Sequence, residues 1–213
     1  MILIKIYYQD NEIVICEKPY GVSSQKSNGD NMVDMLSSQL GCSIFPVHRL
    51  DTTTTGLMAF AKTEKSAAIL SSDIASHNFE KYYLAICHGC VDKSVEMRDF
   101  LYHDRIKNKS FVVENKRKGS KEAILQLERI SENQERNLSL VKIRLLTGRT
   151  HQIRVQLASR GNMLYGDGKY GAKDNDKIAL HSHILKLFHP ITREALEFKS
   201  MPCGEAWLSF KEE

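Results

Sequence analysis

The chain has 213 residues, a mass of 24.3 kDa, 42% hydrophobic residues and a formal net charge of +4 at neutral pH. This length suffices for one good core, and no apolar run approaches the roughly 20 residues that cross a bilayer. The first residues alternate like a strand instead of forming the continuous apolar block of a signal peptide. Five cysteines without a disulfide spacing favour a reducing compartment, so we expect a cytoplasmic protein without disulfides.

The first half of the chain favours a hairpin and two short helices. Residues 2–8 and 12–17 predict two strands around a polar turn, and Lys-Pro-Tyr-Gly at 18–21 ends the second strand. A helix is predicted over residues 31–40, with Asp30 as its N-cap and Gly41 as its stop. A second helix is predicted over about residues 64–76.

Strands dominate the second half. Apolar runs and alternating patterns predict strands at residues 82–86, 110–114, 122–130 and 138–146. The fold class that we expect is therefore α+β, a single domain over residues 1–213 with a mixed, mainly antiparallel sheet and flanking helices.

The most informative stretch places one carboxylate, Asp51, between Arg49 and a run of four threonines. Apolar runs on both sides predict a polar turn held by a scaffold. Such a turn can present a side chain to a cleft, as a catalytic carboxylate requires.

A second informative stretch, residues 146–157, predicts a strand that runs into a helix. Thr150 suits an N-cap and Gly161 a C-terminal stop. Helical spacing places His151 and Arg154 on one face, with Arg149 just before them, so cationic groups should converge at the helix start. The alternative is a surface helix with ordinary solvated arginines.

Positive charge is concentrated between Arg105 and Lys121, where seven basic residues accompany one acid, Glu114. This segment carries +6, so the remainder of the chain sums to −2. A local excess of this kind suits a surface that binds phosphates. The alternative is a solvated hairpin whose lysines protect a sheet edge.

Four separated blocks resemble the RluA-type pseudouridine synthases, which isomerise uridine in structured RNA. The first is the strand at residues 13–22 with its lysine-proline-x-glycine turn, and the second is His48-Arg49-Leu50-Asp51 through Thr63. The third is Lys81-Tyr82-Tyr83-Leu84-Ala85. The fourth is Gly148-Arg149-Thr150-His151-Gln152-Ile153-Arg154, supported downstream by Gly166-Asp167, Leu180-His181-Ser182 and His189-Pro190.

Departures from the family pattern are few. Thr55 stands where the family usually has serine, and Met163 where it usually has proline. Many relatives carry an S4-type RNA-binding module ahead of the first block, which here begins within about a dozen residues of Met1. We therefore expect the form without an S4 domain, a monomer in which the catalytic domain itself captures RNA in a central cleft.

The resemblance implies a reaction that breaks the bond from ribose C1′ to uracil N1, rejoins the base through C5 and removes the C5 proton. It needs no cofactor and no metal, and the chain shows no nucleotide-binding motif. Asp51 would be the essential carboxylate, as nucleophile or as base. Arg154 would keep it ionised, and Tyr83 would lie beside the target uracil as the base for the C5 proton. By position alone, Tyr82 fits a strand tyrosine equally well.

The resemblance also implies the residues that contact RNA. The target base must leave its stack, and Arg49 would fill the gap that it leaves. The other predicted RNA contacts line the site or bind backbone: His48, Lys81, Arg149, His151 and Gln152, with Lys116, Arg117 and Lys118 of the basic segment. His48 suits a structural histidine equally well.

Other interpretations remain open at this point. Cys87 and Cys90 have the spacing of half a zinc site, and His181 with His183 share a strand face, but the chain has no second Cys-x-x-Cys. A catalytically silent RNA-binding or folding factor would use the same surface. A glycosidase-like hydrolase would ask for two carboxylates in defined roles, and only Asp51 stands out.

Overall fold

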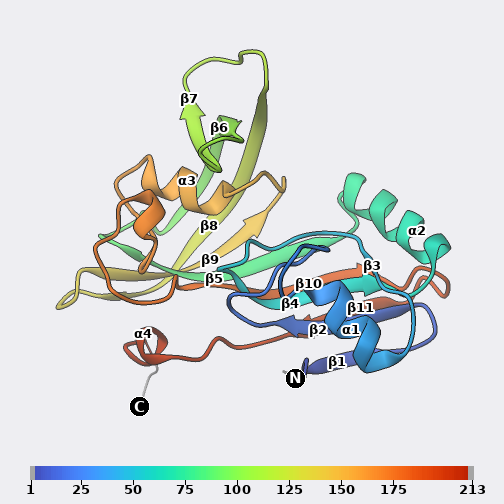
Figure 1. Ribbon diagram of the computed structural model, residues 1–213. Coiled ribbons are helices and arrows are strands. Elements are labelled where there is room, and N and C mark those ends of the chain that lie inside the picture. Colours follow the sequence, from blue (N-terminus) through green and yellow to red (C-terminus); the bar gives the residue numbers. More distant parts are fainter. Residues whose placement is uncertain (1–2, 211–213) are drawn as a thin grey trace. The chain divides into compact units, whose positions relative to one another are not determined.

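The computed structural model describes residues 3–210, which contain eleven strands, four α-helices and one short 3-10 helix (Figure 1). The chain divides into two compact units. The first unit is Met1–Lys81 with His181–Pro202, and the second unit is Tyr82–Leu180 with Cys203–Glu213. Within the described residues, no helix is both long and apolar enough to span a membrane.

The first unit is built on strands that run in the order β1 (Ile6–Gln9), β2 (Ile13–Lys18), β4 (Thr55–Ala61) and β10 (Leu180–Phe188). The short strand β3 (Phe45–Pro46) pairs with β4, and β11 (Ala195–Lys199) pairs with β10. All these pairs are antiparallel except β4 with β10. The helices of this unit are α1 (Met32–Leu40) and α2 (Glu64–Ala75).

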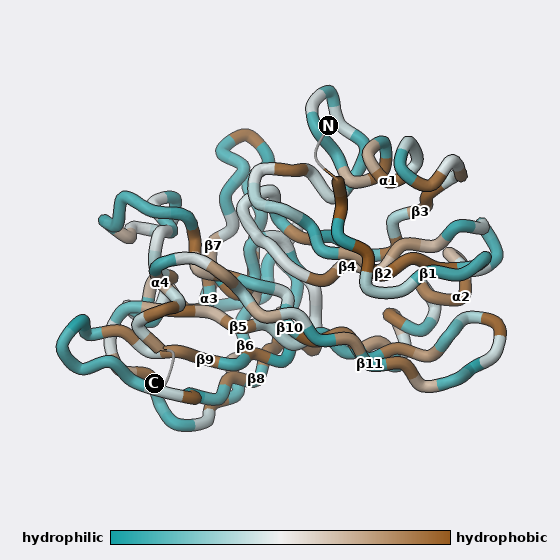
Figure 2. Tube along the Cα trace, turned by 90° about the horizontal axis from the view of Figure 1, so that it is seen from below, coloured by the Kyte–Doolittle hydropathy of each residue, from teal (hydrophilic) through white to brown (hydrophobic). Residues whose placement is uncertain are grey.

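The central strands of the first unit are buried on both faces. This explains why residues 13–16 of β2 and 57–61 of β4 are continuous apolar runs instead of alternating ones; Figure 2 shows brown, hydrophobic stretches of the trace at the β2 label. One face packs against Leu70 of α2 and Phe79. Gly56 permits the parallel approach of β10, because a Cβ at this position would lie 2.3 Å from the Ser182 carbonyl oxygen, and its φ is +106°.

The second unit contains an antiparallel run of strands in the order β5 (Glu80–His88), β9 (Leu138–Leu145), β8 (Ser120–Asn133), β6 (Ser94–Asp104) and β7 (Lys109–Val113). Its helices are α3 (Gln152–Ala158), the 3-10 helix (Gly168–Tyr170) and α4 (Glu205–Leu208). Buried Val141 and Ile143 of β9 alternate with half-buried Lys142 and Arg144, as in a strand with one apolar and one polar face.

Most predicted elements are confirmed. The β1–β2 hairpin, both early helices and the four later strands are present, but the first strand begins at Ile6, later than predicted; residue 2 of the predicted range lies outside the described residues. The predicted cap Asp30 is wrong, because Asn31 caps α1 by accepting the Asp34 N–H at 3.0 Å. Gly41 ends that helix in the left-handed conformation, as predicted.

Candidate active site

The candidate carboxylate, Asp51, lies in a tight turn just before β4. The Thr54 N–H closes the turn by donating to the Asp51 carbonyl at 2.9 Å. The buried Ser24 hydroxyl holds the Leu50 backbone in both directions, donating to its carbonyl at 2.6 Å and accepting from its N–H at 2.9 Å. The backbone around Asp51 is therefore held on both sides, as precise placement of a catalytic side chain requires.

A buried lysine supports the same turn, and the sequence pattern had not assigned it to the site. Lys18 has no exposed surface, and its ammonium donates to the carbonyls of Pro19 (2.8 Å), Val22 (2.8 Å) and Thr52 (3.0 Å). Burial lowers the pKa of Lys18 to about 8, while the charge of Asp51 opposes that change. A lysine at the end of a buried strand, before a Pro-x-Gly turn, was the available signal, because its three donors can satisfy three inward-facing carbonyls.

His48 holds β4 in place. Its Nε2 accepts the Ala59 N–H at 3.0 Å, and because a backbone amide can only donate, the neutral ring carries its proton on Nδ1. That Nδ1 is buried without a hydrogen-bond partner among the described residues, and the ring lies 5.4 Å from the Phe79 ring. Burial, together with the positive charge of Lys81, lowers the pKa of His48 to about 3. Arg49, in contrast, is exposed, as insertion into an RNA stack would require.

Helix α3 begins differently from the prediction. Thr150 as N-cap is wrong: the residue before the helix is His151, in the left-handed conformation with φ 56°, and no side chain caps the helix. Tertiary contacts explain the difference. The Tyr170 hydroxyl lies 3.0 Å from the His151 Nδ1, and the Ser110 hydroxyl donates to the Thr150 carbonyl at 2.6 Å. These contacts outweigh the capping preference of a threonine.

Arg154 of α3 is held by Asp167. This aspartate belongs to the Gly166-Asp167 pair that supports the family resemblance, but the sequence predicted no role for it. The Arg154 Nε and Nη2 each donate to an Asp167 carboxylate oxygen at 2.7 Å, and the residues are only 6% and 2% exposed. The guanidinium also lies 5.2 Å from the centroid of the Tyr170 ring. This bidentate contact sets the plane of the guanidinium. The pairing of Arg154 with Asp51 stays a prediction.

Arg149 and Gln152 are turned toward β8. The Gln152 Oε1 accepts from the Thr147 hydroxyl at 2.8 Å and from the Arg149 N–H at 3.0 Å, while its Nε2 donates to the Ile124 carbonyl at 3.1 Å. The Arg149 Nε donates to the Glu122 carbonyl at 2.8 Å. Both side chains stabilise the strand-to-helix turn, and the convergence of cationic groups at the helix start stays a prediction.

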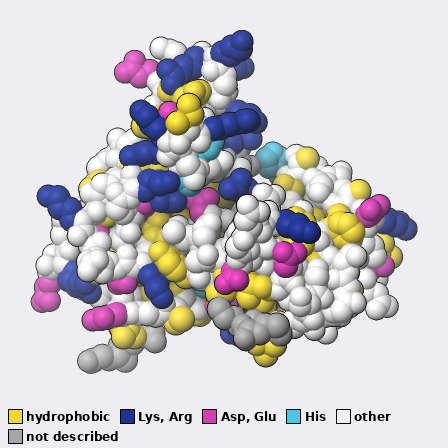
Figure 3. Space-filling view, viewed as in Figure 1, with side chains coloured by type: hydrophobic (Ala, Val, Ile, Leu, Met, Phe, Trp, Pro, Cys, Tyr) yellow, Lys and Arg dark blue, Asp and Glu magenta, His cyan; other side chains and the backbone are white. Residues whose placement is uncertain are grey.

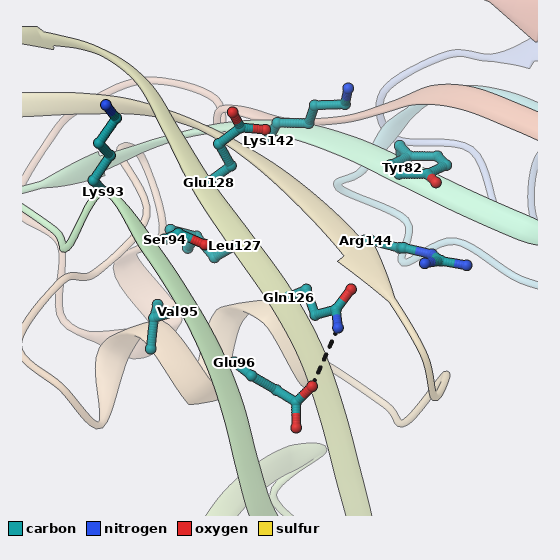
Figure 4. A pocket seen from close by; sticks show the side chains of 10 residues that line it. All are labelled: Tyr82, Lys93, Ser94, Val95, Glu96, Gln126, Leu127, Glu128, Lys142 and Arg144. Atoms are coloured by element: carbon teal, nitrogen blue, oxygen red, sulfur yellow. Dashed lines mark hydrogen bonds between the residues drawn. The ribbon is translucent and has the colours of Figure 1, made fainter.

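The adjacent tyrosines of β5 face opposite sides of their sheet. Tyr83, 4% exposed, stands opposite Ile143, on the face where Ala123 packs against Val155 of α3. Tyr82 lines an open groove of about 590 Å³ on the other face. The groove also presents charges of both signs, including Lys142, Arg144, Glu96 and Glu128 (Figure 4). Strand geometry thus places Tyr83, the tyrosine that the motif register selects, on the face that carries α3.

The basic segment forms two exposed turns, one from β6 to β7 and one from β7 to β8. Lys116, Arg117 and Lys118 are exposed in the second turn, where the Ser120 hydroxyl accepts the Arg117 N–H at 2.8 Å and donates to its carbonyl at 2.7 Å. The Arg117 guanidinium lies 4.7 Å from the centroid of the Tyr102 ring. Figure 3 shows lysine and arginine side chains gathered around β6 and β7. The positive charge predicted from the sequence is therefore presented on ordered strands and turns.

The cysteines and histidines considered for zinc have other partners. No group of three or more histidine, cysteine or acidic side chains among residues 3–210 is arranged to hold a metal ion. Cys87 is buried, which raises the pKa of its thiol to about 12, and the His88 Nε2 lies 2.7 Å from an Asp174 carboxylate oxygen. The rings of His181 and His183 both contact Ser200.

Comparison with known proteins identifies the family. The sequence profile described as RNA pseudouridylate synthase matches residues 12–159. The chain is 33% identical over 203 residues to "Uncharacterized RNA pseudouridine synthase YhcT" of Bacillus subtilis, covering 90% of this chain and 66% of that protein. It is 30% identical to "Ribosomal large subunit pseudouridine synthase D" of Zymomonas mobilis, covering 98% and 72%. The chain therefore belongs to the RNA pseudouridylate synthase family.

Further relatives widen the range of named targets. The chain is 27% identical to "tRNA pseudouridine synthase C" of Vibrio parahaemolyticus, covering 92% of this chain and 89% of that one. The structure of "Human RNA Pseudouridylate Synthase Domain Containing 1" shares the fold, with a TM-score of 0.80 at 20% identity, covering 93% and 83%. The chain spans 59% to 66% of the length of several curated relatives that it matches.

Proposed function

We propose that this protein converts a uridine of structured RNA into pseudouridine, with Asp51 as the essential carboxylate. The observation that carries the proposal is the Asp51 turn, whose backbone is held from both sides and which lies beside the buried ammonium of Lys18. In the reaction the C1′–N1 bond breaks, the uracil turns, the C1′–C5 bond forms and the C5 proton leaves. N1 takes up a proton as C5 gives one up, so the product is an isomer of the substrate and no co-reactant is required.

The remaining catalytic roles divide between two residues of the second unit. Arg154, whose orientation is set by Asp167, would keep the Asp51 carboxylate ionised, because a nearby cation favours the charged form of an acid. Tyr83, buried on the face that carries α3, would lie against the uracil and accept the C5 proton. Asp51 itself acts either as nucleophile on C1′ or as the base that begins elimination.

Ribosomal and transfer RNA are the substrate classes that we propose, since relatives are named for each. The exposed Arg49 would fill the space that the flipped uridine leaves. Lys81 and His151 would contribute further contacts, and the exposed basic turn would contact phosphates. We place the reaction in the cytoplasm, carried out by a monomer; five cysteines with free thiols accord with a reducing compartment.

The direct test uses total RNA isolated from cells that lack the gene. The RNA is incubated with purified protein, and pseudouridines are mapped by carbodiimide modification and primer extension. Wild-type protein should add a discrete pseudouridine, whereas Asp51→Asn, which retains the shape of the side chain, should add none while still binding RNA. Full activity of Asp51→Asn would refute the proposed role of this carboxylate.

The basic turn is tested separately by reversing its charge. Replacing Lys116, Arg117 and Lys118 with glutamate should raise KM for RNA about tenfold or more and leave kcat nearly unchanged, because these residues lie on an exposed turn. Glutamate at Lys26, Lys65 and Lys199, three exposed lysines of the first unit, is the matched control. An equal KM for both variants would remove the basic turn from the RNA contact surface.

A further inference from the structure

A chain of hydrogen bonds runs through the first unit to the first residue after the Asp51 turn. The Thr55 hydroxyl lies 2.8 Å from the Nδ1 of His181, and the His181 Nε2 lies 3.1 Å from the Ser200 hydroxyl. Ser200 in turn donates to a Glu17 carboxylate oxygen at 3.0 Å, and the Tyr7 hydroxyl donates to the same oxygen at 2.7 Å. Four strands, β1, β2, β4 and β10, are connected in this way.

The direction of each bond follows from the chemistry of its members. A carboxylate only accepts, so Ser200 donates to Glu17 and is left to accept from the Nε2–H of His181. His181 is 2% exposed, and burial disfavours its charged form, so its other nitrogen, Nδ1, is an acceptor. The Thr55 hydroxyl therefore donates to His181, and its rotamer is determined by the chain.

The place of Thr55 connects this chain to the proposed reaction. The turn that presents Asp51 is closed by the Thr54 N–H, and Thr55 follows directly as the first residue of β4. His181 stands opposite Thr55 in the parallel register of β4 with β10. The side chain of His181 thus holds the end of the turn at the point where the chain enters the sheet.

Stability alone is a weak explanation for a buried polar chain at this position. An apolar pair would pack between the same strands without the loss of hydration that buried polar groups suffer. What the chain of hydrogen bonds adds is a defined orientation of the Thr55 side chain, since it allows one rotamer instead of several. Small displacements of a reacting group lower catalytic rates about 100-fold. A defined orientation of Thr55 therefore affects the rate if it limits the movement of the adjoining turn that carries the catalytic carboxylate.

We infer that His181 is a positioning residue: through Thr55, and backed by Ser200 and Glu17, it fixes the end of the turn that aims the Asp51 carboxylate. This inference rests on the proposed function. It requires that breaking the chain slow the chemical step and leave RNA binding intact. It also requires that serine at position 55, which keeps the hydroxyl group, preserve activity.

The experiment measures single-turnover release of tritium from RNA labelled at C5 of uracil. The probe is total RNA from cells that lack the gene, grown with [5-³H]uridine, and protein is in excess over RNA. Thr55→Val breaks the chain, and Thr55→Ser keeps it. Thr53→Val is the matched control, because it makes the same change at a buried hydroxyl of the same turn that has no hydrogen-bond partner among the described residues.

Thr55→Val should lower the maximal rate constant about 10- to 100-fold, with the half-saturating protein concentration unchanged within about twofold. Thr55→Ser and Thr53→Val should stay within about threefold of wild type. Adding His181→Gln to Thr55→Val should lower the rate no further, because both changes break one chain. Circular dichroism confirms folding; if Thr55→Val does not fold, Ser200→Ala, which breaks the chain farther from the turn, decides by the same criteria.

Several results would overturn the inference. With wild-type protein active, each of three outcomes would do this. The chain-breaking variant could keep full activity, Thr55→Val and Thr53→Val could lose activity equally, or only the half-saturating protein concentration could change. If wild-type protein releases no tritium from any RNA, the proposed function fails and this inference fails with it.

Discussion

Acid should destabilise the first unit well above the pH at which its carboxylates titrate. Two histidines of this unit, the half-buried His48 and the buried His181, are neutral in the folded protein, and loss of hydration lowers their pKa values to about 3 and about 4 from 6.5. Below pH 6.5 the unfolded chain therefore binds protons at these two histidines that the folded chain does not bind. The resulting stability is fully present above pH 6.5 and is lost as the pH falls toward about 4.

The magnitude follows from the shift of His181, a residue that is only 2% exposed. One pKa unit corresponds to about 1.4 kcal/mol, so lowering the pKa from 6.5 to about 4 amounts to about 3 kcal/mol at acid pH. His48 acts in the same direction. Three carboxyl groups also have a lowered pKa, and they lose their contributions only below their ordinary pKa values, which are 3.8 for Asp10 and Asp174 and 4.5 for Glu12. At pH 4.5 and above, the histidines therefore dominate the change.

The assay is urea unfolding followed by circular dichroism at pH values from about 7 to about 4.5. Wild-type protein should lose about 2 to 3 kcal/mol more across this range than His181→Gln, which removes the titrating group. The comparison uses the slope of the free energy of unfolding against pH, so a lower absolute stability of the variant does not affect it. Equal slopes for the two proteins would refute the reasoning that burial of His181 controls acid stability.

Three further predictions test other contacts. Gly56→Ala should destabilise the protein by about 3 kcal/mol or more in urea unfolding, because its Cβ would lie 2.3 Å from the Ser182 carbonyl oxygen, whereas Gly29→Ala, with nothing within 4 Å, should change stability by less than about 1 kcal/mol. Asp167→Asn should lower tritium release about 10-fold or more with the fold retained, because the Arg154 guanidinium loses its charged bidentate partner; activity equal to wild type would contradict this. Lys18→Met should lower the free energy of unfolding by about 3 kcal/mol, because three carbonyls lose their donor. If it lowers this free energy no more than Lys65→Met, a change at an exposed lysine, Lys18 does not support the turn.

Much of the fold was predictable because its signals are local. The β1–β2 hairpin, the Thr63-capped α2 and the alternation in β9 each follow from a few neighbouring residues. Capping was predicted less well. Asn31 was preferred to Asp30, and at Thr150 distant partners, Ser110 and Tyr170, decided the backbone.

The site was predictable in its residue types and much less in its contacts. The sequence marked Asp51 and Arg154 through their motifs, but assigned no role to Asp167 or Lys18. A bidentate partner 13 residues away and a lysine bound to the carbonyl of a residue 34 positions distant leave no periodic pattern. The position of Lys18 before the Pro-x-Gly turn is a local signal, but the Thr52 carbonyl that it binds and the carboxylate that holds Arg154 depend on which strands and helices lie together.

By itself, the sequence determined the element types, the positive charge of the basic turn and the family, because composition, periodicity and motif spacing are properties of the chain alone. Only the tertiary structure decided that His48 holds β4, that Gln152 serves the strand-to-helix turn and that α3 covers the face of Tyr83 while Tyr82 lines the open groove. It also decided that a histidine from β10 holds the threonine beside the Asp51 turn. The physical reason is that burial and hydrogen-bond partners are set by which distant segments pack together, and no local pattern records that choice.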